Sequence, residues 1–100
     1  TVTEAQGATI RWLWAKADGA PTFSLRLLEI APGGASPLHT HPYEHEVYIL
    51  EGKAVLRGDG AERTLAAGDT ALVLPDELHQ FANAGSGVLR FLCAIPNPKG

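Results

Sequence analysis

Short alternating or apolar stretches recur along this chain every eight to twelve residues or so, with turn-forming residues between them. No segment of about eleven residues repeats its apolar side chains with the 3.6-residue period of a helix. Gly and Pro gather between the stretches, where Gly permits a positive φ and Pro withholds a backbone donor. The pattern predicts an all-β protein with little or no helix. The expected strands cover residues 9–14, 23–30, 44–50, 54–57, 62–65, 70–74, 79–83 and 88–95.

Length and composition favour one globular domain. A chain of 100 residues buries one modest core, so we expect a single domain over residues 1–100. Its 45% hydrophobic and 19% charged residues are ordinary for a globular protein. Sequential antiparallel strands that each bury one face are accommodated by a closed barrel or a double-sheet jelly roll.

The charge balance and the cysteine count argue against several kinds of partner and location. A net charge of -3 lacks the basic excess that binds nucleic acid or an anionic membrane surface. The single cysteine, Cys93, cannot form an intramolecular disulfide and favours a reducing compartment. No apolar run approaches the roughly 20 residues of a membrane span. We therefore expect a cytoplasmic protein with no nucleic-acid and no membrane partner.

Three of the four histidines, His39, His41 and His45, lie within seven residues. Side chains alternate along an extended chain, so His39 and His41 share a face, and His45 has the inward parity of Val47 and Ile49. Neutral imidazole is a common ligand of transition metals, and burying several together in a barrel has few other uses. Exposed loop histidines, or individually satisfied core histidines, are the alternative interpretation.

The spacing of these histidines resembles the first motif of the cupin family. That motif is a glycine, five residues, His-x-His, three or four residues, Glu, six residues and a glycine. Here Gly33, His39, His41, His45 and Gly52 keep the spacing. A histidine stands in place of the glutamate.

A second stretch resembles the second cupin motif, in which a histidine follows a glycine by eleven positions and an asparagine comes after three more residues. Gly68, His79 and Asn83 keep that spacing. Pro75 comes one position later than usual and Glu77 replaces the usual glycine, so the turn before His79 departs from the family pattern.

The resemblance implies a cupin double-stranded β-helix, a jelly-roll barrel, with motif 1 at residues 33–52 and motif 2 at residues 68–83. It places all four histidines of the chain, His39, His41, His45 and His79, on the metal-ligand positions. Residues 39–46 and 91–96 are similar to those of small single-domain bacterial cupins that hold manganese with four histidines. The implied cofactor is one divalent transition metal per chain, manganese first, with iron, nickel, cobalt or zinc as alternatives.

Three functions follow for such a centre, each with a small-molecule substrate or ligand. An octahedral ion with four imidazole ligands keeps two open coordination positions, which suits a dioxygenase-like oxidoreductase. A tetrahedral zinc ion would be saturated by the four imidazoles and would have no open position. The alternatives are a metal-dependent isomerase or lyase and a non-enzymatic module that binds a small ligand or a metal. The sequence supplies no obvious general base for the isomerase, and we assign no catalytic residue.

A few other side chains have two interpretations each. Glu44 and Glu46 could orient imidazoles, but exposed carboxylates are the favoured interpretation. Phe81 and Cys93 are expected to face inward, as pocket wall or as core.

The aromatic residues near the start of the chain favour contacts between subunits. Trp12 and Trp14 share a face, and so do Phe23, Leu25 and Leu27; core or subunit contact is favoured over pocket lining for both sets. We expect a homodimer, with Trp12 and Trp14 as candidates for its interface.

Overall fold

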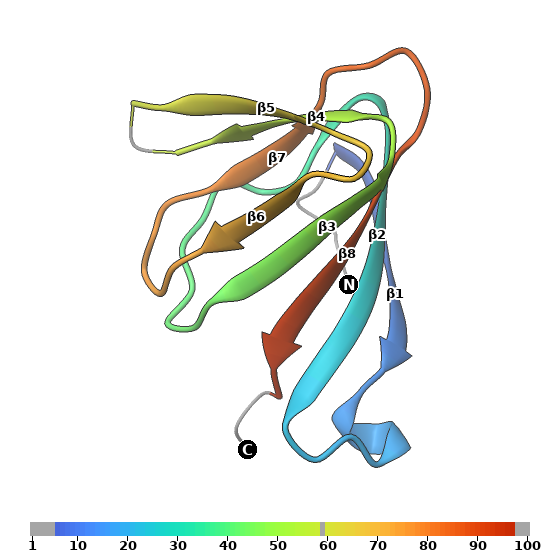
Figure 1. The fold of residues 1–100 in the computed structure, drawn as a ribbon, viewed down its shortest axis with the longest axis vertical. Coiled ribbons are helices and arrows are strands. Elements are labelled where there is room, and N and C mark those ends of the chain that lie inside the picture. Colours follow the sequence, from blue (N-terminus) through green and yellow to red (C-terminus); the bar gives the residue numbers. More distant parts are fainter. Residues whose placement is uncertain (1–5, 59, 98–100) are drawn as a thin grey trace.

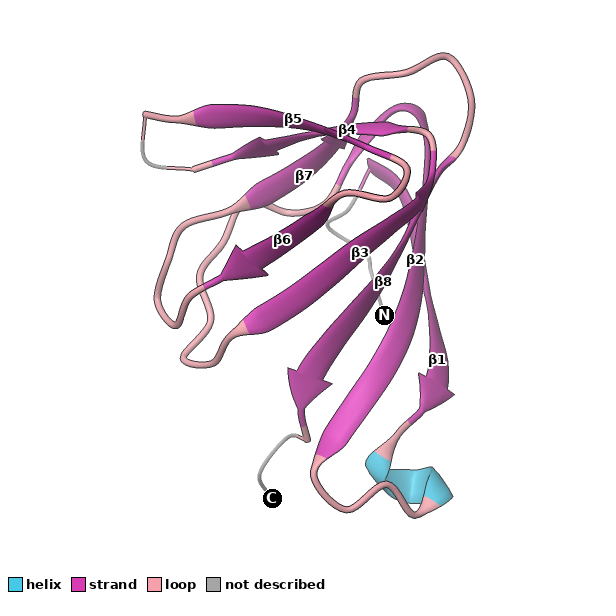
Figure 2. Cartoon of the chain, viewed as in Figure 1, coloured by secondary structure: helices cyan, strands magenta, loops and turns pink. Residues whose placement is uncertain are grey.

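The computed structural model describes residues 6–58 and 60–97. Strands make up most of this part of the chain, with one short 3₁₀ helix, and their order is drawn in Figures 1 and 2. The elements are β1 (Gln6–Trp14), η1 (Lys16–Asp18), β2 (Phe23–Ala35), β3 (His45–Glu51), β4 (Lys53–Arg57), β5 (Glu62–Ala66), β6 (Thr70–Val73), β7 (Gln80–Asn83) and β8 (Leu89–Pro96).

The strands form one antiparallel sheet rolled into a nearly closed barrel, the jelly roll that was predicted. Their order is β5-β4-β7-β2-β8-β3-β6, and β1 pairs with β2. In Figure 1 the strands β1, β2, β8, β3 and β6 form one wall, and β7, β4 and β5 form the other. Most strands that pair in the sheet are distant in sequence. Strand β2, for example, lies between β7 and β8. Crossovers bring these distant strands together, as in a jelly roll.

Alternation along the strands decides which side chains reach the interior. In β3, His45, Val47 and Ile49 are buried while Glu46 and Tyr48 are exposed. Strand β8 alternates in the same way, and its inward residues, together with those of β2 and β3, supply much of the core. The predicted inward parity of His45 is confirmed.

Strand β2 is longer than expected, because it continues past Ile30 to Ala35. Pro32 and Gly33 suggested an end, but Ala35 pairs with Ala82 of β7, so the strand passes from one wall of the barrel to the other. Gly33 has a φ of +80°, which helps the chain bend at this corner.

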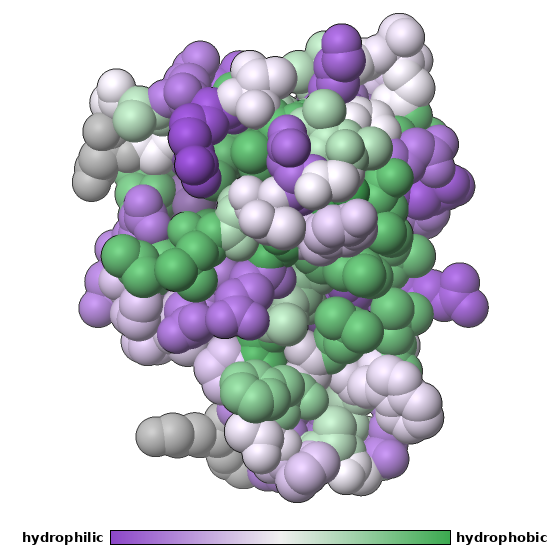
Figure 3. All heavy atoms as spheres, in the orientation of Figure 1, coloured by the Kyte–Doolittle hydropathy of each residue, from purple (hydrophilic) through white to green (hydrophobic). Residues whose placement is uncertain are grey.

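The aromatic side chains near the start of the chain are not in the core. Trp12, Trp14 and Phe23 are 48%, 62% and 65% exposed. Core packing is therefore wrong for these three, and subunit contact stays a prediction. Figure 3 shows other apolar side chains gathered on the face over β3, β8 and β2. Among the described residues, no helix has the length and apolar character needed to cross a membrane.

Candidate metal centre

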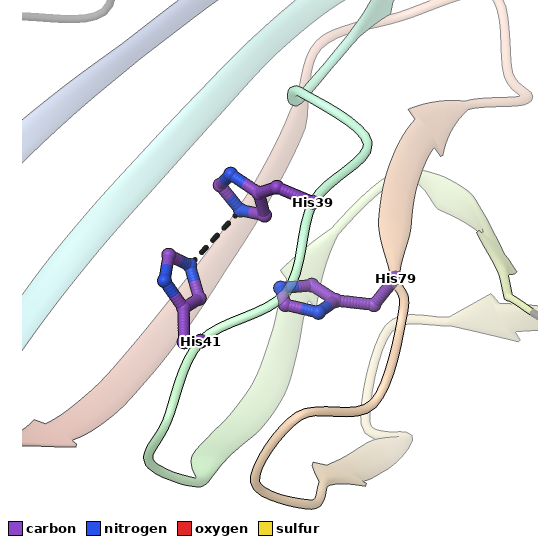
Figure 4. A group of neighbouring side chains, drawn as sticks. All are labelled: His39, His41 and His79. Carbon is purple, nitrogen blue, oxygen red and sulfur yellow. Dashed lines mark hydrogen bonds between the residues drawn. The ribbon is translucent and has the colours of Figure 1, made fainter.

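Three imidazoles meet where two connections run side by side in the barrel. His39 and His41 lie between β2 and β3, and His79 directly precedes β7. His39 and His79 form an isolated antiparallel bridge with two backbone hydrogen bonds, of 3.1 and 3.0 Å. One nitrogen from each of the three rings falls within 4.8 Å of the others (Figure 4). The bridge joins the two motifs, although His79 lies one residue before the strand in which it was expected.

Hydrogen bonds of His79 and His41 indicate which of their ring nitrogens are available to a metal. His79 Nδ1 lies 2.9 Å from the carbonyl oxygen of Glu77, which can only accept, so Nδ1 carries a proton and Nε2 is the nitrogen available to a metal. His41 Nε2 lies 3.0 Å from His39 Nε2, drawn as the dashed line in Figure 4. Because one of these two nitrogens donates and the other accepts, a single cation could replace the proton they share.

The unusual turn before His79 is held by one backbone and one side-chain hydrogen bond. Asp76 takes the left-handed conformation, with a φ of 65°, and its amide donates to the His41 carbonyl at 2.6 Å. The Glu77 carboxylate accepts a hydrogen bond from the Leu74 amide at 2.9 Å. The departures from the family pattern therefore change the turn without moving His79 out of the cluster.

His45 stands beside these three rings and is oriented by different partners. Its ring centroid lies 4.7 Å from that of His41 and 5.1 Å from that of His79. Its Nδ1 lies 3.2 Å from Cys93 Sγ and 3.5 Å from Arg26 Nη2. The ring is outside the tight group of three, so four equally converging nitrogens are not observed. Its Nε2 is buried without any hydrogen-bond partner.

Burial keeps His41 and His45 neutral. Desolvation, helped by the positive fields of the neighbouring histidines and of Arg26, lowers the pKa of His41 to about 4. Desolvation followed by Arg26 lowers the pKa of His45 to about 3. Neutral imidazole is the form that binds a metal, so both rings are ready to do so near neutral pH.

All four histidines line one cavity of about 110 Å³. Its other walls are mainly apolar and include Phe81 and Cys93, both buried, so each of these two belongs to pocket and core together. Burial raises the pKa of the Cys93 thiol, against the opposing effect of Arg26. Among the described residues, no carboxylate lines the cavity.

The glutamates beside His45 stay outside this cavity. Glu44 and Glu46 are exposed on the opposite face, where a hydrogen bond to Glu46 raises the pKa of Glu44. Exposure was the favoured interpretation and is confirmed.

Arg26 is the site residue that sequence reasoning missed. It lies on β2 directly opposite Cys93 of β8, and its Nη2 donates to Cys93 Sγ at 3.0 Å. The available signal was its parity: Ser24, Leu28 and Ile30 on the same side of β2 are buried, so a charged residue there must face the interior.

The larger hollow lies on the outside of the sheet. This open groove of about 730 Å³ is lined by outward residues such as Tyr48, Leu72 and Leu92, with Glu46 and Arg63 also on its walls. It contains no histidine and no buried polar group, so the smaller cavity is the candidate site.

The histidine nitrogens that line the cavity are suitable ligands for a transition-metal ion. His79 presents Nε2, His39 and His41 are joined by a hydrogen bond between their Nε2 atoms, and the buried Nε2 of His45 lacks a partner. Nitrogen donors of this kind suit manganese, iron, cobalt, nickel or zinc. The three close rings alone could hold such an ion.

Comparison with known proteins identifies relatives by sequence. The chain is 34% identical over 74 residues to the 1-methylthio-D-xylulose 5-phosphate methylsulfurylase of Rhodospirillum rubrum, covering 74% of this chain and 47% of that protein. It is 31% identical over 90 residues to the tetracenomycin polyketide synthase protein TcmJ of Streptomyces glaucescens, covering 89% and 60%. The chain thus spans less than two thirds of the length of either relative.

Solved structures agree with this relationship. The polyketide cyclase RemF from Streptomyces resistomycificus superimposes with a TM-score of 0.87 at 33% identity, covering 94% of this chain and 68% of that one. A sugar phosphate isomerase of the cupin superfamily from Silicibacter pomeroyi gives 0.81 at 27% identity, covering 92% and 60%. The Cupin_2 domain family matches residues 26–95, and with this match over most of the barrel the chain belongs to the cupin family.

Proposed function

We propose that this cupin is a metal-dependent oxidoreductase of the dioxygenase type that acts on a small organic substrate. One divalent ion, manganese first and iron, nickel or cobalt as alternatives, would be held by His39, His41, His45 and His79, whereas zinc would fit the non-catalytic candidate below. The observation that carries the proposal is the buried Nε2 of His45, which has no partner in a cavity shared with the other three histidines.

A buried nitrogen without a partner costs about 1–3 kcal/mol. An ion bound by the neighbouring rings would remove that cost at His45 when its Nδ1 donates to Cys93 Sγ, 3.2 Å away, because the Nε2 lone pair is then left for the metal. The anchored Nδ1 fixes the ring plane, as outer contacts of metal-binding histidines commonly do. His45 is therefore the proposed fourth ligand, although its ring lies outside the closest group.

The ion would supply Lewis acidity and one-electron chemistry for the reaction of dioxygen with an organic substrate. The chain's own contribution is an apolar enclosure with neutral ligands. Phe81 and Phe91 are 4% and 1% exposed and keep bulk water from that side of the cavity. Because no lining carboxylate offsets the ion, its charge would be felt fully inside this enclosure.

An isomerase, lyase or cyclase reaction is the second candidate. The printed names of the similar proteins include a sugar phosphate isomerase and a polyketide cyclase. Such chemistry needs a group that moves a proton, and the lining residues supply no carboxylate for it. The third possibility is a module that binds metal or a small ligand without catalysis.

Metal analysis of protein made without a histidine tag, followed by oxygen-uptake measurements, separates these candidates. Replacing any one of His39, His41, His45 or His79 with Ala should sharply reduce occupancy, whereas Glu46→Ala, beside His45 but exposed, should leave it unchanged. Small phenols, diketones and alkenes are suitable substrates to screen for oxygen consumption.

Each outcome points to one candidate. Oxygen uptake that disappears with the metal supports the dioxygenase. Conversion of a substrate without oxygen uptake supports the isomerase or lyase. Zinc at full occupancy with no turnover supports the binding module, and full occupancy in His45→Ala would remove His45 from the ligand set.

We also propose that the chain forms a homodimer through the outer face of β2, β8, β3 and β6. Leu72 and Tyr48 are 52% and 45% exposed there, and β3, β6 and β8 carry apolar side chains on both faces, as strands covered on both sides do. The groove also carries Glu46 and Arg63, so a second copy related by a two-fold axis brings opposite charges to the same patch. This face is the proposed interface; Trp12 is not part of it, because it lies opposite the inward-facing Arg26.

A further inference from the structure

Arg26 carries the only fixed charge among the described residues that line the histidine cavity. It projects from the inner face of β2, between the buried residues Ser24 and Leu28, so its guanidinium cannot escape to the outer surface of the sheet. Long charged side chains are rarely placed on the inner face of a barrel without a partner.

The contacts of Arg26 leave its charge without a counter-ion. Its Nη2 donates to Cys93 Sγ at 3.0 Å and lies 3.5 Å from His45 Nδ1. The guanidinium carbon lies 5.6 Å from the centre of the Trp12 ring, on the neighbouring strand β1. The Nε atom is buried and has no hydrogen-bond partner. No carboxylate of the described chain forms an ion pair with Arg26.

A bound divalent ion would increase this imbalance of charge. The four histidines are neutral ligands, and the remaining walls, which include Ile10, Leu28 and Phe91, are mostly apolar. Two positive centres that line one small, mostly apolar cavity repel each other unless an anion lies between them or beside both. The lining side chains therefore supply no negative charge to balance Arg26 and a bound ion.

We propose that Arg26 binds the anionic group of the substrate, and that the substrate is a small 2-hydroxy or 2-oxo carboxylate. Such a molecule offers two adjacent oxygens to a metal and a negative charge to a guanidinium, whose planar fork suits a carboxylate. The cavity of about 110 Å³ is well below the roughly 300–1,000 Å³ of pockets for drug-sized ligands, so the molecule must be small. The inference rests on the metal centre proposed above.

The experiment compares glycolate with glycolamide, which have the same shape but differ in charge. The manganese-loaded protein is titrated with each compound, and binding is followed by calorimetry and by the manganese electron paramagnetic resonance spectrum. The wild-type protein should bind glycolate at least tenfold more tightly than glycolamide. Arg26→Gln should reduce that ratio about tenfold, and Arg26→Lys should keep more of it.

Arg11→Gln is the matched control, because Arg11 is exposed on β1, lines neither the histidine cavity nor the outer groove, and should leave the ratio unchanged. Metal content is measured in every sample, so loss of the ion is recognised separately. A wild-type protein that holds neither manganese nor any of the alternative ions overturns the metal centre itself. A loaded wild-type protein that binds both compounds equally, or a loaded Arg26→Gln variant with the wild-type ratio, overturns the role of Arg26. The wild-type comparison stands even if the variant fails to fold.

Discussion

His45 is the residue at which the ligand set departs from the usual cupin pattern, and this departure changes the net charge of the proposed metal centre. A carboxylate at this position would cancel part of the charge of a bound ion, whereas an imidazole cancels none. We predict that His45→Glu still binds manganese or iron but lowers the reduction potential, because the added negative charge stabilises the higher oxidation state. Metal analysis with redox titration of the loaded protein measures both effects.

Glu46→Ala is the control for this substitution, since Glu46 is adjacent but exposed. It should leave both metal content and potential at wild-type values. The opposite pattern, with the site emptied by Glu46→Ala and undisturbed by His45→Glu, would mean that the ligand has been assigned to the wrong residue.

The lowered pKa values make the stability of the metal-free protein dependent on pH. The pKa is about 4 for His41 and about 3 for His45, below the ordinary value of 6.5 that the unfolded chain would show. Between these values the unfolded chain binds protons that the folded chain does not, so the free energy of unfolding decreases as pH falls from about 6.5 toward 4.

Urea unfolding after chelator treatment, at pH 7 and pH 5, measures this decrease for the wild-type protein and for a His41→Gln, His45→Gln double variant. The double variant should lose less stability over the same interval. Equal losses in the two proteins would show that these imidazoles do not cause the pH dependence.

At the scale of elements, Gly33 and Gly52, the glycines at the two ends of the first motif, have different structural roles. Gly52 joins β3 to β4 with a φ of +89°, and a Cβ there would lie 2.7 Å from the carbonyl oxygen of Val88. Gly33 has a φ of +80° within β2, but a Cβ there would have nothing within 4 Å.

We predict that Gly52→Ala lowers the free energy of unfolding by on the order of 2–4 kcal/mol, from backbone strain and backbone clash together. Gly33→Ala should cost only about 1 kcal/mol, from strain alone. Urea denaturation of both variants measures the difference. Equal costs would show that the close approach of Val88 does not limit this turn.

At the scale of the whole molecule, the exposed outer face of the barrel predicts self-association. Sedimentation at tens of micromolar, a range in which mass action is readily tested, should give a dimer and not a monomer of 10.6 kDa. Leu72→Arg should shift the protein toward monomer, because a buried unpaired charge weakens an interface. Leu38→Arg is the control, since Leu38 is similarly exposed at 55% but lies outside the groove.

Either of two results would contradict the proposed dimer. A wild-type protein that sediments as a monomer rejects the dimer. A wild-type dimer that is disrupted equally by both substitutions, or by neither, rejects this face as the interface.

Alternation and spacing allowed much of the barrel to be predicted, because both depend on residues close together in the chain. The period-2 pattern placed His45, Val47 and Ile49 on the inner face of β3, and burial of all three confirms it. Turn residues located most strand boundaries within a few positions. Strand β2 exceeded its expected end at Ile30, because the local Pro and Gly signals carry no information about pairing with a distant strand.

The spacing of the histidines was a property of the sequence by itself, and it was enough to select them as candidate ligands. Only the tertiary structure decided how they meet. Strand register sets Arg26 opposite Cys93, 67 residues away, and a backbone bridge sets His39 beside His79. Local patterns fix the face on which a side chain lies, but the partner it meets across the barrel depends on sheet order and register. Those are chosen by the packing of the whole chain.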